Sequence, residues 1–122
     1  MISRNDNLRT LGVHLLLDLE NCNEKILNDL DIIKQTLISA AQKSGARIMG
    51  ETFHKFTPVG VTGIVSIAES HISIHTWPEF NYAAVDIFSC GEDFDLESCA
   101  RVISDNLKCD QITKRKINRG LH

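Results

Sequence analysis

The stretch that decides the fold is Ala68-Glu69-Ser70-His71-Ile72-Ser73-Ile74-His75-Thr76-Trp77-Pro78-Glu79. Its residues alternate in character, which is typical of a half-buried β-strand. One face of that strand is apolar or small and carries Ile72, Ile74 and Thr76. The other face carries two imidazoles, a hydroxyl and an indole, from His71, Ser73, His75 and Trp77. A purely structural strand would rarely align these groups, so the sequence predicts a core face and a reaction face.

Working outward, similar patterns predict further strands at residues 11–19, 46–56, 62–69, 82–90 and 111–117. Apolar residues recur at steps of three and four from Ile26 to Ala41 and from Leu96 to Leu107, which predicts two amphipathic helices. Asn23 or Asp29 is the expected N-cap of the first helix and Asp95 that of the second. Gly45 is placed to end the first helix.

The predicted order of elements is therefore β-α-β-β-β-β-α-β within a single domain spanning residues 1–122. Two helices against one largely antiparallel sheet make a two-layer α+β sandwich with both helices on one face. The other sheet face carries His14, Asp18, His71, His75 and Trp77. That face is too mixed for an ordinary core and too apolar for ordinary surface, so it needs a second layer or forms an open site.

Composition argues against several classes of protein. The net charge is -3, so nucleic-acid binding is not the first interpretation. The basic residues Lys114, Arg115, Lys116 and Arg119 are interpreted as a solvated edge. No stretch approaches the roughly 20 apolar residues of a membrane span. The N-terminus, with Arg4, Asn5 and Asp6, does not read as a signal peptide.

The four cysteines, Cys22, Cys90, Cys99 and Cys109, contain no Cys-x-x-Cys pair, which disfavours a zinc knuckle. Without a secretory signal they are expected to be cytosolic thiols, and the protein is expected to be cytoplasmic. Cys99 is expected to face the core.

The segment Glu69-Ser70-His71, followed by Ile74-His75-Thr76-Trp77-Pro78-Glu79, closely resembles the short prokaryotic pyruvoyl-dependent S-adenosylmethionine decarboxylases. Gly12-Val13-His14, the segment from Thr52 to Phe56 and the segment from Ala83 to Gly91 extend the resemblance over most of the chain. The resemblance implies a homodimer with four layers, α/β/β/α. It also implies decarboxylation of S-adenosylmethionine to the aminopropyl donor of spermidine and polyamine synthesis.

The resemblance further implies that the chain cleaves itself between Glu69 and Ser70. The products are a β chain, 1–69, and an α chain, 70–122, whose first residue becomes a pyruvoyl cofactor. That group is expected to form a Schiff base with the substrate amine and to act as the electron sink that no unmodified side chain provides.

The same resemblance assigns roles to individual residues. Ser70 is the pyruvoyl precursor, His75 accepts a proton during processing, and Cys90 donates a proton during decarboxylation. A thiol with a pKa near ~8.5 suits proton transfer in both directions. Phe56 and Trp77 are expected to line the substrate pocket, where an aromatic face attracts a sulfonium cation. Glu79 is expected to bind ribose hydroxyls.

Thr62 stands where the family commonly has a serine that supports processing, and it keeps the hydroxyl but restricts χ1. Asp18 lies where relatives carry an acidic residue, without an assigned role. His14 and His54 are interpreted as structural, and His71 is open between a structural and a functional role.

Other functions stay open at this point. The same pyruvoyl chemistry could act on a basic amino acid, ornithine or arginine. A non-enzymatic metal domain could use His71, His75 and Cys90, although residues four apart on a strand are widely separated. An inactive relative could serve as a partner subunit, but Ser70, His75 and Cys90 argue against it. No metal is therefore expected.

Overall fold

The structure is a computed structural model that describes residues 10–68, 70–90 and 93–122. These residues form six strands, three α-helices and a 3₁₀ helix, in the order β1 (Thr10–Glu20), α1 (Glu24–Leu27), α2 (Leu30–Lys43), β2 (Ile48–Lys55), β3 (Val61–Ile67), β4 (Ser70–Trp77), η1 (Pro78–Phe80), β5 (Tyr82–Ser89), α3 (Leu96–Asn106) and β6 (Gln111–Leu121).

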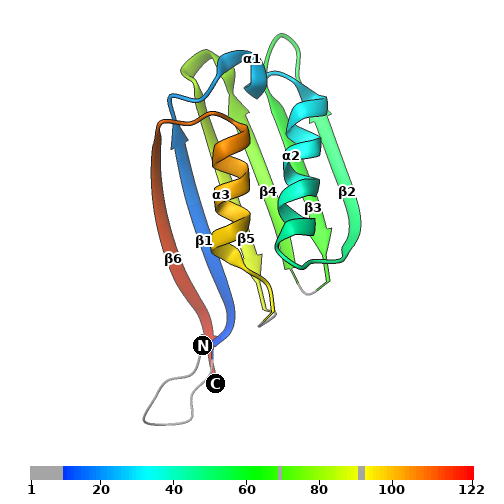
Figure 1. Cartoon of the computed structure of the whole chain (residues 1–122), viewed down its shortest axis with the longest axis vertical. Helices are drawn as coiled ribbons and strands as arrows, with labels where there is room; N and C mark the ends of the chain where they lie inside the picture. The colour runs from blue at the N-terminus through cyan, green and yellow to red at the C-terminus, as the bar shows by residue number, and fades with distance from the viewer. Residues whose placement is uncertain (1–9, 69, 91–92) are drawn as a thin grey trace.

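The strands form one sheet in the order β2-β3-β4-β5-β1-β6, and every neighbouring pair is antiparallel. Helices α2 and α3 lie side by side across one face of this sheet (Figure 1). The predicted two-layer α+β architecture, with its helices on one face, is therefore confirmed.

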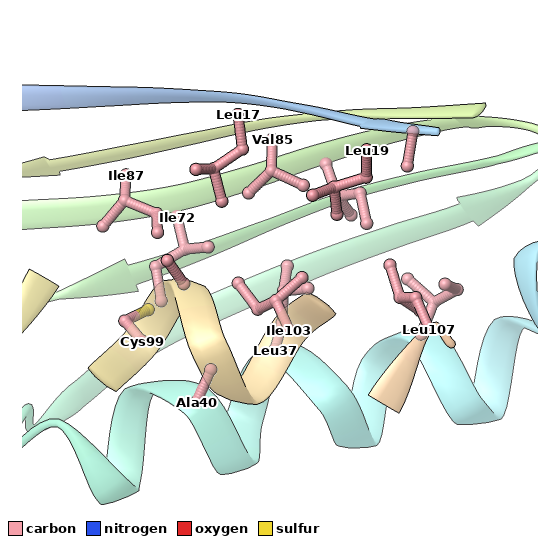
Figure 2. Packing of buried hydrophobic residues seen from close by; sticks show 14 of the residues in the cluster. Leu17, Leu19, Leu37, Ala40, Ile72, Val85, Ile87, Cys99, Ile103 and Leu107 are labelled. Carbon is pink, nitrogen blue, oxygen red and sulfur yellow. The ribbon is translucent and has the colours of Figure 1, made fainter. Parts of the chain in front are cut away.

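The hydrophobic core lies between the sheet and the two long helices (Figure 2). From β4 it receives Ile72 and Ile74, which are fully buried as the alternation predicted. Helix α3 contributes Ile103 and Cys99, which confirms that Cys99 faces the core. The antiparallel register keeps alternate side chains of every strand on the opposite side.

We call that opposite side the open face, because neither α2 nor α3 covers it (Figure 1). The strand registers place on it the side chains of Gly12, His14, Leu16, Asp18, Thr52, His54, Thr62, Ile64, Ser66, His71, Ser73, His75, Trp77, Tyr82, Ala84, Asp86, Phe88, Thr113, Arg115 and Ile117.

The prediction of one helix from Ile26 to Ala41 was wrong, because the chain breaks it into α1 and α2. Both candidate caps are used: the Asn23 side chain accepts the Ile26 N–H at 3.0 Å, and the Asp29 side chain accepts the Ile32 N–H at 3.1 Å. A second cap inside the apolar stripe starts a new helix without interrupting the stripe. Gly45, with φ +88°, follows the end of α2 as expected.

The last strand is longer than predicted, since β6 continues past Ile117 to Leu121. It is an edge strand, and all its residues are exposed. The Lys114 ammonium lies 2.7 Å from the Glu97 carboxylate of α3. The basic residues therefore lie on a solvated edge, as interpreted from the sequence, and charged edges discourage pairing with other sheets.

The interpretation of all four cysteines as thiols was wrong for two of them. Cys22 and Cys109 form a disulfide across 87 residues of sequence. The end of β1 pairs with the start of β6, at Glu20 and Gln111, so the connections that carry the two cysteines meet. Local sequence carries no signal for this contact, because it depends on the order of strands in the sheet. In the part of the chain described, no helix is long and apolar enough to cross a membrane.

Candidate active site

Antiparallel pairing sets Thr62 of β3 directly beside His75 of β4 on the open face. The Thr62 hydroxyl oxygen and His75 Nδ1 lie 3.0 Å apart and share a hydrogen bond. The two residues predicted to support and to perform proton transfer in processing are thus in contact. A hydroxyl bound to one ring nitrogen orients the imidazole and leaves the other nitrogen for a second partner.

Aromatic rings extend from His75 along the same end of the open face. The ring centroids of His75 and Trp77 lie 6.3 Å apart, and those of Trp77 and Tyr82 lie 5.4 Å apart. The side chains of Glu20, Trp77, Phe80 and Tyr82 line a pocket of about 320 Å³. Trp77, which is predicted to line the substrate pocket, therefore borders a pocket whose wall includes the carboxylate of Glu20.

Tyr82 is a member of this group that the sequence analysis did not single out. Its hydroxyl donates to Asp18 Oδ1 at 2.5 Å. This hydrogen bond, with some burial, raises the pKa of Tyr82 from 10.0 to about 12. The contact gives Asp18 a partner, and it shows that Tyr82 is a hydrogen-bond donor at neutral pH. The available signal was that Tyr82 opposes Trp77 across two neighbouring strands.

Phe56 and Glu79 lie toward this same end of the sheet. Phe56 directly follows β2, is exposed, and packs edge-on against His54 with the centroids 4.5 Å apart. Glu79 lies in η1, immediately after Trp77. The structure thus groups Thr62, His75, Trp77, Phe56 and Glu79 near one end of the sheet, which we call the aromatic end.

Ser70 and Cys90 lie at the opposite end of the sheet. Ser70 is the first residue of β4 and pairs with Ile67 of β3 on one side and Ser89 of β5 on the other. Cys90 comes directly after Ser89 and is exposed. Ser70 begins β4, and Cys90 directly follows the neighbouring strand β5. The predicted pyruvoyl precursor and the predicted proton donor therefore lie at the same end of the sheet, which we call the cleavage end. Glu69, the other side of the predicted cleavage point, lies outside the described residues.

The two ends are well separated. Ser70 and His75 are five residues apart on β4, which corresponds to about 16 Å along a strand. Five is also an odd number, so their side chains leave the strand on opposite faces. Within one copy of the chain, His75 does not approach Ser70.

Other candidate groups are removed from the site. Cys99 is fully buried, and burial raises the pKa of its thiol to about 12. Among the described residues, no three His, Cys, Asp or Glu side chains lie close enough together to hold a metal ion. His71 and His75 accordingly do not converge with Cys90.

From the sequence, His14 is interpreted as structural, and Asp86 is not among the predicted site residues. His14 Nε2 lies 3.0 Å from Asp86 Oδ1, and both side chains are half-buried on the open face. The two residues are separated by 72 positions, so only the pairing of β1 with β5 brings them together. The sequence indicated only that each of the two side chains lies on the face opposite the apolar positions of its own predicted strand.

The fold is a two-layer α+β domain with a helix-free sheet face, on which a hydroxyl–imidazole pair, aromatic rings and carboxylates gather. Such a grouping of side chains is typical of a small enzyme. The comparisons with known proteins identify the class. A profile of the S-adenosylmethionine decarboxylase family matches residues 13–120. The chain belongs to the S-adenosylmethionine decarboxylase family.

Individual relatives agree with that assignment. The S-adenosylmethionine decarboxylase proenzyme of Thermodesulfovibrio yellowstonii is 47% identical over 111 residues, covering 91% of this chain and 82% of that protein. The proenzyme of Caldicellulosiruptor saccharolyticus is 42% identical, covering 93% of this chain and 92% of its own length. The crystal structure of adenosylmethionine decarboxylase from Aquifex aeolicus superposes with a TM-score of 0.81 at 34% identity, covering 92% of both chains.

Proposed function

We propose that this chain is a self-cleaving proenzyme and that its mature form decarboxylates S-adenosylmethionine to the aminopropyl donor of polyamine synthesis. The observation that carries the proposal is the pairing of Ser70 with Ser89, which brings Ser70 and Cys90 to the same end of the sheet, the cleavage end. The family membership supplies the substrate, since the relatives are named for it. The cytoplasm is the proposed location.

Cleavage at the bond between residues 69 and 70 suits the observed topology. β3 ends at Ile67 and β4 begins at Ser70, so the bond lies in the connection between two paired strands. Cutting it leaves the pairing from His71 onward intact. A new chain end at position 70 is therefore compatible with the sheet, opposite Ser89, which directly precedes Cys90 in the sequence.

The proposed maturation uses Ser70 as nucleophile. Its hydroxyl oxygen attacks the carbonyl carbon of Glu69, the peptide C–N bond breaks, and an ester links the two residues. His75, oriented by Thr62, removes the α-proton of residue 70. The bond between Cβ and Oγ of residue 70 then breaks, which leaves the Glu69 carboxylate on one side and a dehydroalanine at position 70 on the other. Water then replaces nitrogen at the dehydroalanine, ammonia leaves, and position 70 carries a pyruvoyl group.

The two products would stay together because the strands interleave. The 1–69 product holds β1, β2 and β3, and the 70–122 product holds β4, β5 and β6. β1 lies between β5 and β6 in the sheet, and β3 pairs with β4. Separating the products would break three strand pairings, open the core and require reduction of the Cys22–Cys109 disulfide, so we infer a stable two-chain unit.

We infer a homodimer in which two open faces pack against each other in opposite directions. The support is the distance along β4 between Ser70 and His75 within one chain, which such packing would remove by setting the aromatic end of one copy over the cleavage end of the other. The open face also exposes Ile64, Trp77 and Ile117, an apolar surface suited to burial. Each site would then draw residues from both copies, giving four layers, α/β/β/α.

In the mature enzyme, the pyruvoyl carbonyl supplies the electron sink for loss of carbon dioxide. The Cys90 thiol donates the proton that the α-carbon then needs. Phe56 and Trp77 provide exposed aromatic faces for the adenine ring and the sulfonium cation. Glu79 accepts hydrogen bonds from the ribose hydroxyls. These roles favour a nucleoside-bearing substrate over ornithine or arginine.

The test is the mass of denatured protein after reduction of the Cys22–Cys109 disulfide, which would otherwise join the two products. It is measured for the wild type and for Ser70→Ala, with Ser73→Ala as a matched control on the same strand. We expect two fragments from the wild type and from Ser73→Ala, and one whole chain from Ser70→Ala. The 70–122 fragment should be lighter by one ammonia than the same fragment with an unmodified N-terminal serine. Carbon dioxide release is then compared among S-adenosylmethionine, ornithine and arginine. An intact wild-type chain, or release only from a basic amino acid, would overturn the proposal.

A further inference from the structure

A cluster of rings on the open face lies next to the cleavage end and has no role in the scheme above. It consists of His14, His71, Asp86 and Phe88, and we call it the Phe88 cluster. The His71 ring stacks on Phe88 with centroids 5.7 Å apart and planes at 23°. The His14 ring meets Phe88 edge-on at 6.1 Å, with planes at 82°. Phe88 is therefore held between two imidazoles.

The cluster is anchored on both sides of the Phe88 ring. Asp86 fixes His14 through the 3.0 Å contact to its Nε2 atom. Beneath the ring lies Gly12 of β1, where an added Cβ would overlap the Phe88 ring. Only glycine leaves room for the ring at position 12, so the backbone of β1 and the ring of Phe88 pack directly together.

Chain connectivity ties this cluster to both predicted reactive positions. His71 is bonded to residue 70, the pyruvoyl precursor, and Phe88 is two residues before Cys90, the proton donor. The row His14–Phe88–His71 lies immediately beside the row Val13–Ser89–Ser70 across the same three strands. The stack of His71 on Phe88 is thus a side-chain link between the strand that begins at residue 70 and the strand that leads to residue 90.

We propose that Phe88 is a positioning residue for decarboxylation, which holds residue 70 relative to Cys90 through its stack on His71. The inference rests on the proposed function, because only that function makes this separation matter. Proton transfer to carbon requires the acid and the carbon in a fixed geometry, and a misplacement of about 1 Å can cost on the order of 10²-fold in rate. Ring stacking supplies such rigidity because it restrains two neighbouring strand ends at once.

The chain contains a matched control for this ring. Phe53 of β2 is also half-buried and also lies over a glycine, Gly63, whose added Cβ would overlap the Phe53 ring. That pair lies on the helix-covered side of the sheet, on the opposite face from Thr62 and His75 and away from the cleavage end. Phe88→Leu and Phe53→Leu therefore remove the same atoms from similar positions over a glycine, and only the first removes a link to residue 70.

The experiment measures kcat, KM, the cleaved fraction and the thermal midpoint for wild type, Phe88→Leu and Phe53→Leu. We expect complete cleavage in all three and similar losses of thermal midpoint. For Phe88→Leu we expect kcat to fall on the order of 10²-fold with KM little changed, while Phe53→Leu keeps kcat near the wild-type value. Equal kcat in the two variants would overturn the proposal. Failure of Phe88→Leu alone to cleave would also overturn it and would assign the ring to maturation.

A second set of variants tests the contact between Gly12 and the Phe88 ring. Gly12→Ala keeps the ring but displaces it, and we expect its kcat to fall as in Phe88→Leu. In the double variant the smaller leucine makes room for the methyl group, so the effects should be strongly non-additive. Additive losses would contradict a shared mechanism. A wild type that neither cleaves nor turns over would instead refute the proposed function, so the two failures are distinguishable.

Discussion

Thr62 stands where the resemblance implies a serine, and its contact with His75 is compatible with that exchange. Its hydroxyl reaches His75 Nδ1 at 3.0 Å, so the added methyl group of threonine does not prevent the hydrogen bond. Restriction of χ1 by β-branching also keeps the hydroxyl pointed in one direction. The hydroxyl is thus the feature to remove in a test.

We predict that Thr62→Val, which keeps the shape and deletes the hydroxyl, slows cleavage at the 69–70 bond by about 10²-fold, because a positioned proton-transfer group contributes at least that factor. Thr62→Ser should cleave at a rate near that of the wild type. The measurement is the fraction of cleaved chain against time after synthesis, resolved by denaturing electrophoresis under reducing conditions. Equal rates for the valine and serine variants would remove Thr62 from the maturation machinery.

Tyr82 offers a prediction about pH, because its pKa is raised to about 12 by the hydrogen bond to Asp18 and by burial. A group whose pKa is raised on folding stabilises the fold fully below its unfolded pKa, near 10. That stabilisation is lost as the pH rises through about 12. The expected result is that phenolate absorbance appears only near that pH.

This titration is clean because Tyr82 is the only tyrosine in the sequence. Asp18→Asn should lower the midpoint toward 10.0, since it removes the carboxylate charge. Circular dichroism at each pH checks that the sheet is intact. A midpoint near 10 in both proteins would show that the contact between Tyr82 and Asp18 does not persist in solution.

At the scale of elements, hydrophobic alternation was sufficient to predict the strands, because each strand buries one face and shows the other. It was insufficient for the first helix. The apolar stripe continues from Ile26 through Leu30 to Ile33, so periodicity alone joins α1 to α2. The break lies at Asn28 and Asp29. The Asp29 side chain accepts the Ile32 N–H, a local contact that competes with continuation of the helix, and the Asn28 side chain accepts the Gly60 N–H. A periodicity count registers neither contact.

The cap at Asp29 can be tested directly. Its side chain accepts the Ile32 N–H, and α2 carries Ile33 and Leu37 into the core. We predict that Asp29→Ala lowers the free energy of unfolding by about 1 kcal/mol. Asp31→Ala is the matched control, since Asp31 is exposed in the same first turn and loses only a helix-dipole term of a few tenths of a kcal/mol. Urea denaturation compares the two, and equal losses would contradict the capping role.

At the scale of the whole molecule, the order of strands explains what the sequence could not reveal. The insertion of β1 between β5 and β6 creates the His14–Asp86 contact, the contact of Gly12 with the Phe88 ring and the Cys22–Cys109 disulfide. Each joins residues more than 70 positions apart. The face on which a side chain lies follows from local alternation, whereas its neighbour on the next strand follows from topology. The candidate residues were therefore predictable one by one, but their grouping into two ends was not.

That grouping makes the quaternary proposal testable by mixing two inactive chains. We predict that Ser70→Ala and His75→Ala each remain uncleaved when produced alone. When they are produced together with different tags, the His75→Ala chain should be cleaved, because a mixed dimer combines its Ser70 with the His75 of the other copy. The measurement is the mass of each denatured and reduced chain from dimers purified through both tags, because the Cys22–Cys109 disulfide would otherwise join the cleavage products.

The contrary result is equally specific. If His75 acted within its own chain, the His75→Ala chain would stay whole in every mixture, and the separation of about 16 Å along β4 would have to close by rearrangement of the strand. Since β4 is paired on both sides from Ser70 to His75, such a rearrangement would break the centre of the sheet. A second copy supplies the missing imidazole without disturbing any strand, which is why cleavage in the mixture is the expected outcome.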